Sequence, residues 1–202
     1  ASTDSYGPIT LIPNTSPTPN VATSQSWTFI HDIAVSKNKI GGNYYVYVGN
    51  YDGLQVSTDG GQTFTNAISA LGTNATDVDV CDDGSVYVAG GTSQYTGNNK
   101  IFYSPAASAG SVGSFINVTP PASTTYAYSN YGRIEIAPSR TNSSVIYASV
   151  AKPLTTAATS LVIWQSVDHG NTWSNIGSGS TNFLPFATYG QGDYDHILEV
   201  FP

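Results

Sequence analysis

Four residues of the types used in glycoside hydrolysis lie near the starts of short strand-like segments. Asp32, Asp77 and Asp195 each begin or precede an apolar run, and Arg133 precedes another. General acid–base cleavage of a glycosidic bond needs two carboxylates held about 5–10 Å apart across a cleft. We take these four residues as candidates for a functional site. Their spacing alone brings no two of them together, so the sequence assigns no catalytic residue.

Metal and cofactor chemistry find no support in the sequence. Four neighbouring aspartates lack the spacing of a calcium-binding loop and are expected to be solvated hairpin residues: Asp77, Asp79, Asp82 and Asp83. The single cysteine, Cys81, excludes an intrachain disulfide and a zinc site built from several cysteines. The three histidines occupy unrelated settings: His31, His169 and His196. We therefore predict no metal and no cofactor.

The elements that position these residues are expected to be strands. Aromatic residues make up 12% of the chain, Val, Ile and Thr are frequent, and the hydrophobic content of 40% argues against disorder. Charged residues make up only 9%, and the net charge is −7. Clustered cations, which nucleic acids and anionic membranes require, are missing. The composition predicts an all-β protein with no nucleic-acid partner and no direct membrane insertion.

An internal repeat organises the chain from about residue 27 onward. Its clearest marker is a strand centred on tyrosine, and Tyr47, Tyr87 and Tyr147 follow one another at spacings of 40 and 60. An alternating run precedes each tyrosine, and an apolar segment ending in serine follows it. The alternating runs are Asp32–Val35, Asp77–Val80, Arg133–Ile136 and Leu198–Val200. Period-2 patterning with turn residues between the segments predicts four antiparallel strands in each unit.

Tandem four-stranded units are typical of a β-propeller, whose blades pack around a central channel. We predict an all-β, partial β-propeller: three four-stranded antiparallel blades plus the first strand of a fourth. The expected blades cover about 27–72, 73–125 and 126–182, and the fourth starts in 189–202. Residues 1–26 are expected to hold a strand and a Pro/Ser/Thr/Asn-rich linker, and the propeller is expected to continue beyond the given chain. The four candidates would then lie at one mouth of the channel.

The sharpest local motif occurs twice, with the same residue types at the same spacing. Its members are Ser57, Asp59, Gly61, Thr63 and Phe64, and then Ser166, Asp168, Gly170, Thr172 and Trp173. The motif resembles the Asp-box of sialidase-like and sortilin-like propellers, also called the BNR repeat. The resemblance implies structural turns on the outer rim, in which Asp and Ser bond to turn backbone and the aromatic ring is buried. His169 is expected to be a solvated loop residue.

A second resemblance covers the end of the chain. The segment Gln191-Gly192-Asp193-Tyr194-Asp195 is similar to the one that opens a blade in large secreted Asp-box proteins of Bacteroidota, which commonly carry a type IX secretion sorting domain. The chain also begins at Ala1 and contains no methionine. We therefore expect a processed protein, secreted or at the cell surface, whose signal peptide has been removed.

The resemblance leaves two functions open. Sialidases use three arginines around the substrate carboxylate, whereas this chain has only Arg133 and Arg140. Related xyloglucan-cleaving propellers use paired aspartates. The sequence favours a non-catalytic binding or assembly module whose partner is a glycan, a surface protein or the rest of its own chain, because its surface is rich in hydroxyl, amide and phenol groups. The alternative is a glycoside hydrolase with its active site largely in blades outside this chain.

Overall fold

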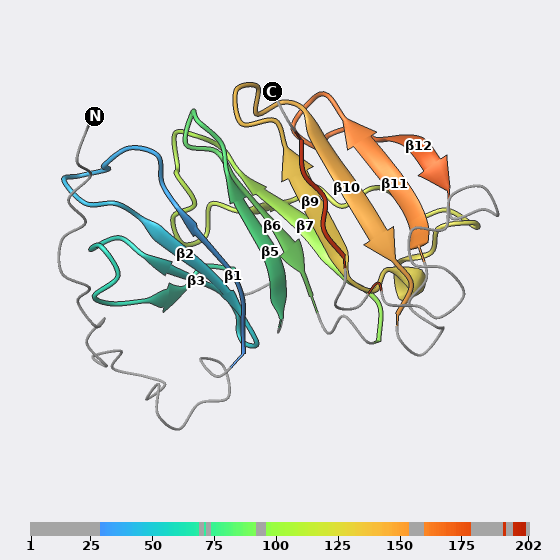
Figure 1. Cartoon of the computed structure of the whole chain (residues 1–202), viewed down its shortest axis with the longest axis horizontal. Helices are drawn as coiled ribbons and strands as arrows, with labels where there is room; N and C mark the ends of the chain where they lie inside the picture. The colour runs from blue at the N-terminus through green and yellow to red at the C-terminus, as the bar shows by residue number, and fades with distance from the viewer. Residues whose placement is uncertain are drawn as a thin grey trace, which may run out of the picture.

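The computed structural model describes residues 29–68, 71, 74–91, 96–153, 160–178, 192 and 196–200. Within them the chain forms three four-stranded antiparallel sheets, each made of consecutive strands. Figure 1 shows the sheets side by side, and the first strands of adjacent sheets are in contact. The described helical structure consists of 3-10 turns such as Tyr128–Asn130. These observations confirm the predicted all-β partial β-propeller with three blades.

Each blade begins with its inner strand and ends with a short or peripheral one. The first blade contains β1 (Ile30–Val35), β2 (Val46–Asn50), β3 (Gly53–Ser57) and β4 (Thr65–Asn66). The second contains β5 (Ala75–Val80), β6 (Val86–Gly90), β7 (Lys100–Ser104) and β8 (Ile116–Asn117). The third contains β9 (Ile134–Pro138), β10 (Ile146–Ala151), β11 (Ser160–Ser166) and β12 (Ser174–Ser178). Glycines with positive φ allow the tight turns before β3 (Gly53, φ 109°) and β6 (Gly84, φ 96°).

The hydrophobic core lies between the blades. One cluster joins the first two blades and includes Tyr47, Leu54, Val78, Val88 and Phe102. A second cluster joins the second and third blades and includes Tyr87, Ile101, Ile134, Ile146 and Trp164. Because both faces of the middle blade are covered, its strand β6 is buried along its whole length. The apolar side chains of the strands therefore pack one blade against the next.

Two of the three aligned tyrosines connect neighbouring blades. The hydroxyl of Tyr47 in β2 donates a hydrogen bond to the carbonyl of Ala109 in the second blade, at 2.6 Å. The hydroxyl of Tyr87 in β6 donates to the carbonyl of Ser143 in the third blade, at 2.5 Å. Both rings are fully buried, so each phenol combines apolar packing with one satisfied polar group. The regular spacing of these tyrosines reflects contacts between blades.

The predicted opening strand of a fourth blade differs in the structure. Residues 196–200 pass beside the third blade, where His196 contacts Ser149 of β10, but they form no strand. An inner strand makes its ladder hydrogen bonds to the second strand of its own blade, and the described residues contain no such partner for 198–200. The predicted N-terminal strand and linker, and most of 189–202, lie outside the described residues.

Candidate functional site

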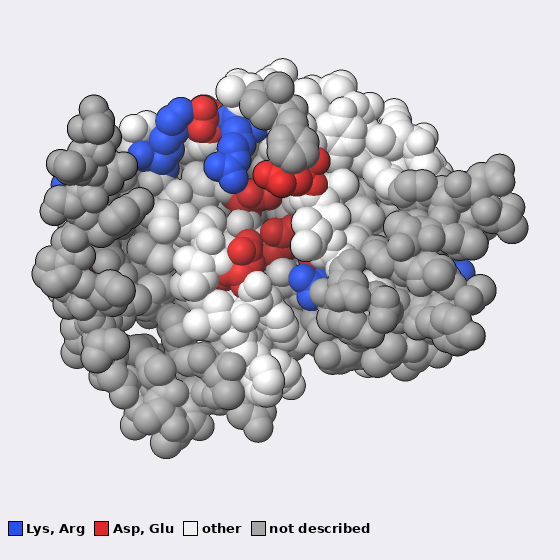
Figure 2. Space-filling model, in the orientation of Figure 1, with Lys and Arg blue, Asp and Glu red and all other residues white. Residues whose placement is uncertain are grey.

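Five carboxylates gather where the inner strands of the three blades meet residues 196–200. They are Asp32 of β1, Asp77 and Asp79 of β5, Glu135 of β9, and Glu199. They line a pocket of about 240 Å³, which we call the acidic pocket. Figure 2 shows Asp and Glu side chains gathered in a hollow in the middle of this face, with Lys and Arg side chains close by. The inner strands of all three blades therefore contribute acids to one pocket.

Strand pairing places three of these acids at one equivalent position. Asp32 pairs with Gly49, two residues after Tyr47, and Asp77 pairs with Ala89, two residues after Tyr87. Glu135 likewise pairs with Ser149, two residues after Tyr147. The alternating runs of the sequence align Arg133 with Asp32 and Asp77. The strand pairing instead aligns Glu135 with them, two residues further along the chain. Register is fixed by pairing with the tyrosine-bearing strand, which the alternating run alone does not reveal.

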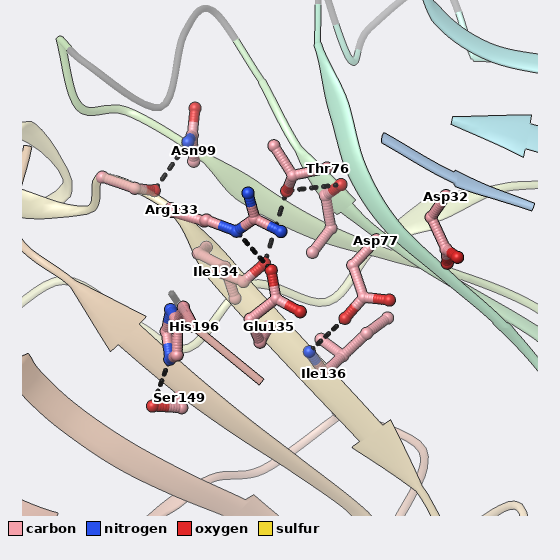
Figure 3. A network of polar contacts seen from close by, with 12 residues as sticks. Asp32, Thr76, Asp77, Asn99, Arg133, Ile134, Glu135, Ile136, Ser149 and His196 are labelled. Carbon is pink, nitrogen blue, oxygen red and sulfur yellow. Dashed lines mark hydrogen bonds and ion pairs between the residues drawn. The ribbon is translucent and has the colours of Figure 1, made fainter. Parts of the chain in front are cut away.

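Asp32 and Asp77 each accept a hydrogen bond from the backbone of the next blade. The Oδ2 atom of Asp32 accepts a hydrogen bond from the backbone N–H of Val78 at 2.8 Å, and Oδ2 of Asp77 accepts one from Ile136 N–H at 2.6 Å. The ladders of β1 and β5 shift register immediately before these aspartates. A β-bulge at such a point redirects the following side chain. Figure 3 shows both carboxylates directed toward the neighbouring inner strand.

Glu135 forms an ion pair with Arg133, which precedes it by two residues in the chain. The Nε atom of Arg133 donates to Oε1 of Glu135 at 2.5 Å, and both side chains are largely buried (15% and 11% exposed). Burial raises the pKa of Glu135, and the attraction of Arg133 offsets this only in part, so the pKa is about 7. A substantial fraction of Glu135 is therefore protonated at neutral pH.

The aspartates of β5 also bind protons more tightly than usual. Burial raises the pKa of Asp77 well above its ordinary value, and repulsion from Glu135 and Asp79 adds to the shift. Burial and repulsion from Asp32 raise the pKa of Asp79 to about 6. Like charges crowded in a partly dry pocket cannot all ionise at the same pH. At neutral pH the pocket therefore contains both carboxylates and carboxylic acids.

His196 closes one side of this network. Its Nε2 atom lies 2.7 Å from Oγ of Ser149, the residue that pairs with Glu135 across the ladder. Burial and the nearby charge of Arg133 lower the pKa of His196 to about 3. The imidazole is therefore neutral at physiological pH. It anchors residues 196–200 on the third blade, as Figure 3 shows for the His196–Ser149 contact.

The arrangement suits recognition of hydroxyl groups. In Asp32 and Asp77 one carboxylate oxygen accepts a backbone N–H from the next blade. This fixes each carboxylate in place and leaves acceptor capacity for further donors. A protonated acid such as Glu135 can also donate a hydrogen bond or serve as a general acid. The pocket can therefore bind sugar hydroxyls and contains a group with the proton affinity of an acid catalyst.

The structure brings together only part of the predicted channel-mouth set. Asp32 and Asp77 line the acidic pocket, whereas Arg133 contacts it through Glu135 and Asp195 lies outside the described residues. Asp79, Glu135 and Glu199 are pocket residues that the sequence did not predict. Alignment on the tyrosines would have found Glu135, because it places this residue level with Asp32 and Asp77.

The two repeated motifs form nearly identical turns after β3 and β11, which we call the Ser-Asp turns (Ser57–Phe64 and Ser166–Trp173). In the first, Oδ1 of Asp59 accepts from Thr63 N–H at 2.9 Å and Oδ2 accepts from its hydroxyl at 2.6 Å. In the second, Asp168 makes the same two bonds to Thr172, at 2.8 and 2.6 Å.

The serine of each Ser-Asp turn bridges its two ends. Ser57 Oγ donates to Asp59 at 2.7 Å and accepts from Gly61 N–H at 2.8 Å. Ser166 Oγ donates to Asp168 and accepts from Gly170 N–H, both at 2.8 Å. The described lining of the acidic pocket contains no residue of either turn.

These hydrogen bonds stabilise the ionised aspartates. Desolvation raises the pKa of Asp59, but the bonds from Thr63 and Ser57 outweigh it and lower the pKa to about 2. The hydroxyl and N–H of Thr172 lower the pKa of Asp168. Both carboxylates are therefore charged throughout the physiological range, whereas the pKa values of Asp77, Asp79 and Glu135 in the acidic pocket are raised.

Three expectations about side chains of the Ser-Asp turns are wrong in detail. Phe64 and Trp173 are half-buried, and Trp173 packs against the core cluster of the second and third blades. The Trp173 Nε1–H donates to the carbonyl of Val118 in the second blade at 2.7 Å. His169 is half-buried as well, because its ring stacks on Tyr103 with centroids 5.1 Å apart and its Nδ1 lies 3.0 Å from the carbonyl of Ser143.

Comparisons with known proteins support the fold. The sequence matches no protein-family model and no curated protein. Among solved structures, a GH74 enzyme of Niastella koreensis superposes with a TM-score of 0.55 at 21% identity, covering 73% of this chain and 22% of that one. An ancestral GH74 enzyme gives 0.54 at 14% identity over 75% of this chain and 19% of that one. The GH74 xyloglucanase of Xanthomonas campestris gives 0.53 at 17% identity over 78% and 24%.

These likenesses concern architecture. The chain spans less than a quarter of the length of each of these three enzymes. TM-scores of 0.53–0.55 at identities of 14–21% show a likeness to the β-propeller fold alone. In the described residues, no helix has the length and apolar character needed to cross a bilayer.

Proposed function

We propose that this chain is a segment of an extracellular β-propeller that binds a neutral glycan at the acidic pocket without cleaving it. The observation that carries the proposal is the fixed geometry of the pocket carboxylates. Asp32 and Asp77 are each held by a backbone N–H of the next blade, at 2.8 and 2.6 Å. Preorganised acceptors bind hydroxyl groups at low entropic cost. Structural likeness to GH74 enzymes, one of them a xyloglucanase, supports xyloglucan as the first ligand to test.

The neutral character of the ligand follows from charge. The pocket gathers five acids, and the chain as a whole carries a net charge of −7. An anionic glycan would meet repulsion there, whereas sugar hydroxyls would find carboxylate acceptors and, in the protonated fraction of Glu135, a hydrogen-bond donor. The same proposal treats the two Ser-Asp turns as Asp-boxes with a structural role. Extracellular placement, by a type IX or another secretion route, and a surface protein as alternative partner remain parts of this proposal.

Calorimetric titration of xyloglucan oligosaccharides into the full-length protein tests the binding role. Asp79 lines the pocket, and Asp79→Asn keeps its shape while changing its charge and proton affinity. We expect this variant to weaken binding by roughly tenfold, which corresponds to about 1.4 kcal/mol. Asp52→Asn makes the same chemical change at the β2–β3 turn, outside the pocket, and should bind like the unmodified protein. Equal affinity of the two variants would refute the pocket as the binding site.

A second candidate function is glycoside hydrolysis, and Glu135 favours it. A carboxylic acid with a pKa of about 7 has the proton affinity of a general acid at neutral pH. In this case the full-length protein would release reducing ends from xyloglucan. Glu135→Gln would then lower turnover at least a hundredfold, as expected for loss of a general acid. Turnover with that dependence would replace the binding-only proposal, whereas binding without turnover would support it.

A further inference from the structure

Two smaller pockets lie next to the acidic pocket, along the loops that join the first and second strands of the blades and, in the second blade, the loop between β7 and β8. The first rim pocket, of about 160 Å³, lies between the first two blades and is lined by Lys37, Ile40, Asp82 and Ala107, among others. The second rim pocket, of about 190 Å³, is lined by Asp82, Ser139, Arg140, Thr141 and Val200. Neighbouring pockets share lining residues, so the three pockets adjoin one another, and we call them the line of pockets.

The shared residues show how the pockets join. Asp82 lines both rim pockets. Arg140 and Val200 line both the second rim pocket and the acidic pocket. Each pocket alone is smaller than the roughly 300–1,000 Å³ that is usual for a drug-sized ligand, whereas the line of three reaches this range. A compact ligand would occupy one pocket, and only an elongated one would use all three.

Contacts between the loops hold this line in shape. Nζ of Lys37 in the first blade lies 2.6 Å from Oδ2 of Asp82 in the second. The backbone N–H of Asp82 donates to the carbonyl of Arg140 in the third blade at 2.8 Å. Successive loops are therefore tied to one another, and the floor of the groove is preorganised before a ligand binds.

The lining chemistry indicates a neutral, linear, hydroxyl-rich chain. Lys37 pairs with Asp82, and Asp83 also lines the first rim pocket, so this pocket carries a net negative charge and disfavours an anionic ligand. Ala106, Ala107 and Ala109 add small apolar surfaces on which the C–H faces of sugar rings can pack. The five carboxylates at the other end of the line disfavour an anionic polymer. These features match the alternating polar and apolar faces of a glucan chain.

We infer that the acidic pocket and the two rim pockets form one groove that binds an extended neutral oligosaccharide across all three blades. This inference rests on the proposed glycan-binding function and adds to it the length and direction of the ligand. Affinity should rise with chain length, because each further sugar binds at the effective concentration set by those already bound. Substitutions that block one end of the groove should remove this rise in affinity with ligand length and leave the binding of short ligands unchanged.

Calorimetry with cellobiose, cellotetraose and cellohexaose, using the full-length protein, tests the groove. Ala107→Tyr fills the first rim pocket and Thr141→Tyr narrows the second, and both residues are exposed in turns or loops. Ala122→Tyr adds the same bulk at an exposed loop position that lines none of the three pockets. We expect affinity to rise at least roughly tenfold from cellobiose to cellohexaose in the unmodified protein and in the Ala122 variant. The other two variants should lose this rise and bind cellobiose unchanged.

The outcomes separate the groove from the function on which it rests. Equal affinity for all three ligands overturns the groove and leaves the glycan-binding proposal standing. The same holds if the Ala107 and Thr141 variants keep the full dependence on length. Failure to bind any cello-oligosaccharide or xyloglucan oligosaccharide overturns the proposed function and the groove together. Circular dichroism of each variant checks that the fold is kept.

Discussion

At the residue scale, the two Ser-Asp turns show how one motif supplies hydrogen-bond partners to the backbone of a tight turn, at two places in the chain. In both, a buried serine donates to the aspartate and accepts the N–H of a glycine four residues later. Glycine and aspartate alone would favour a turn, but the hydroxyl gives the buried N–H its partner. The motif is recognisable in sequence because every hydrogen bond in it is local.

Replacing Ser166 by Ala should therefore destabilise the protein by about 1–3 kcal/mol, the cost of leaving a buried donor unsatisfied. The N–H of Gly170 loses its acceptor at 2.8 Å, and the aspartate loses a donor. Urea unfolding at neutral pH measures the change. Ser174→Ala, at an exposed position of β12, should stay within about 0.5 kcal/mol of the unmodified protein. Equal stability of both variants would show that the buried hydroxyl contributes nothing.

At the element scale, the strands were predictable and their alignment was less so. The alternating runs, the tyrosine spacing and the apolar segments ending in serine located the first three strands of each blade, because these signals lie within a few residues of one another. The equivalence of Asp32, Asp77 and Glu135 depends on pairing with the next strand. The contact of His169 with Tyr103 depends on how two blades pack. Such long-range contacts leave no mark in a local pattern, so the acidic pocket was only partly predicted.

The packing of the third blade on the second makes Gly170 irreplaceable. Its φ is +83°, and a Cβ atom added there would lie 2.7 Å from Cβ of Val118 in the second blade. We expect Gly170→Ala to destabilise the protein much more than Gly60→Ala, as measured by thermal unfolding. Gly60 also has positive φ (+77°), but a Cβ atom added to it would meet no heavy atom within 4 Å, and His169 already occupies the corresponding position of the second turn. Similar losses in the two variants would mean that backbone strain, and not the contact between blades, sets the cost.

At the scale of the whole molecule, acids are divided between two environments. Those of the Ser-Asp turns have lowered pKa values because they accept local hydrogen bonds. Asp77, Asp79 and Glu135 of the acidic pocket have raised pKa values because they are buried close to other acids where the blades meet. The first group favours the folded state when ionised, whereas the second favours it when protonated. The stability of the propeller therefore depends on pH in two separate windows.

We expect the protein to lose stability as the pH rises from about 4.5 to about 8. The lowered pKa of His196 acts in the opposite direction up to about pH 6.5, but the acids of the pocket together outweigh it. The folded state holds protons on Glu135 (pKa about 7, against 4.5 ordinarily) and on Asp79 (about 6, against 3.8), while the unfolded chain releases them earlier. Stability falls with pH wherever the folded state binds more protons than the unfolded state. Below about pH 4 the trend should reverse, because Asp59, with a pKa of about 2, and buried His196, with a pKa of about 3, must then be protonated. Urea midpoints measured across this range should therefore be highest near pH 4–5, where both effects are smallest.

Asp79→Asn should flatten the fall in the urea midpoint between about pH 4 and 6, whereas Asp52→Asn should leave this fall unchanged. A midpoint that rises steadily to pH 8 would contradict the buried acidic pocket.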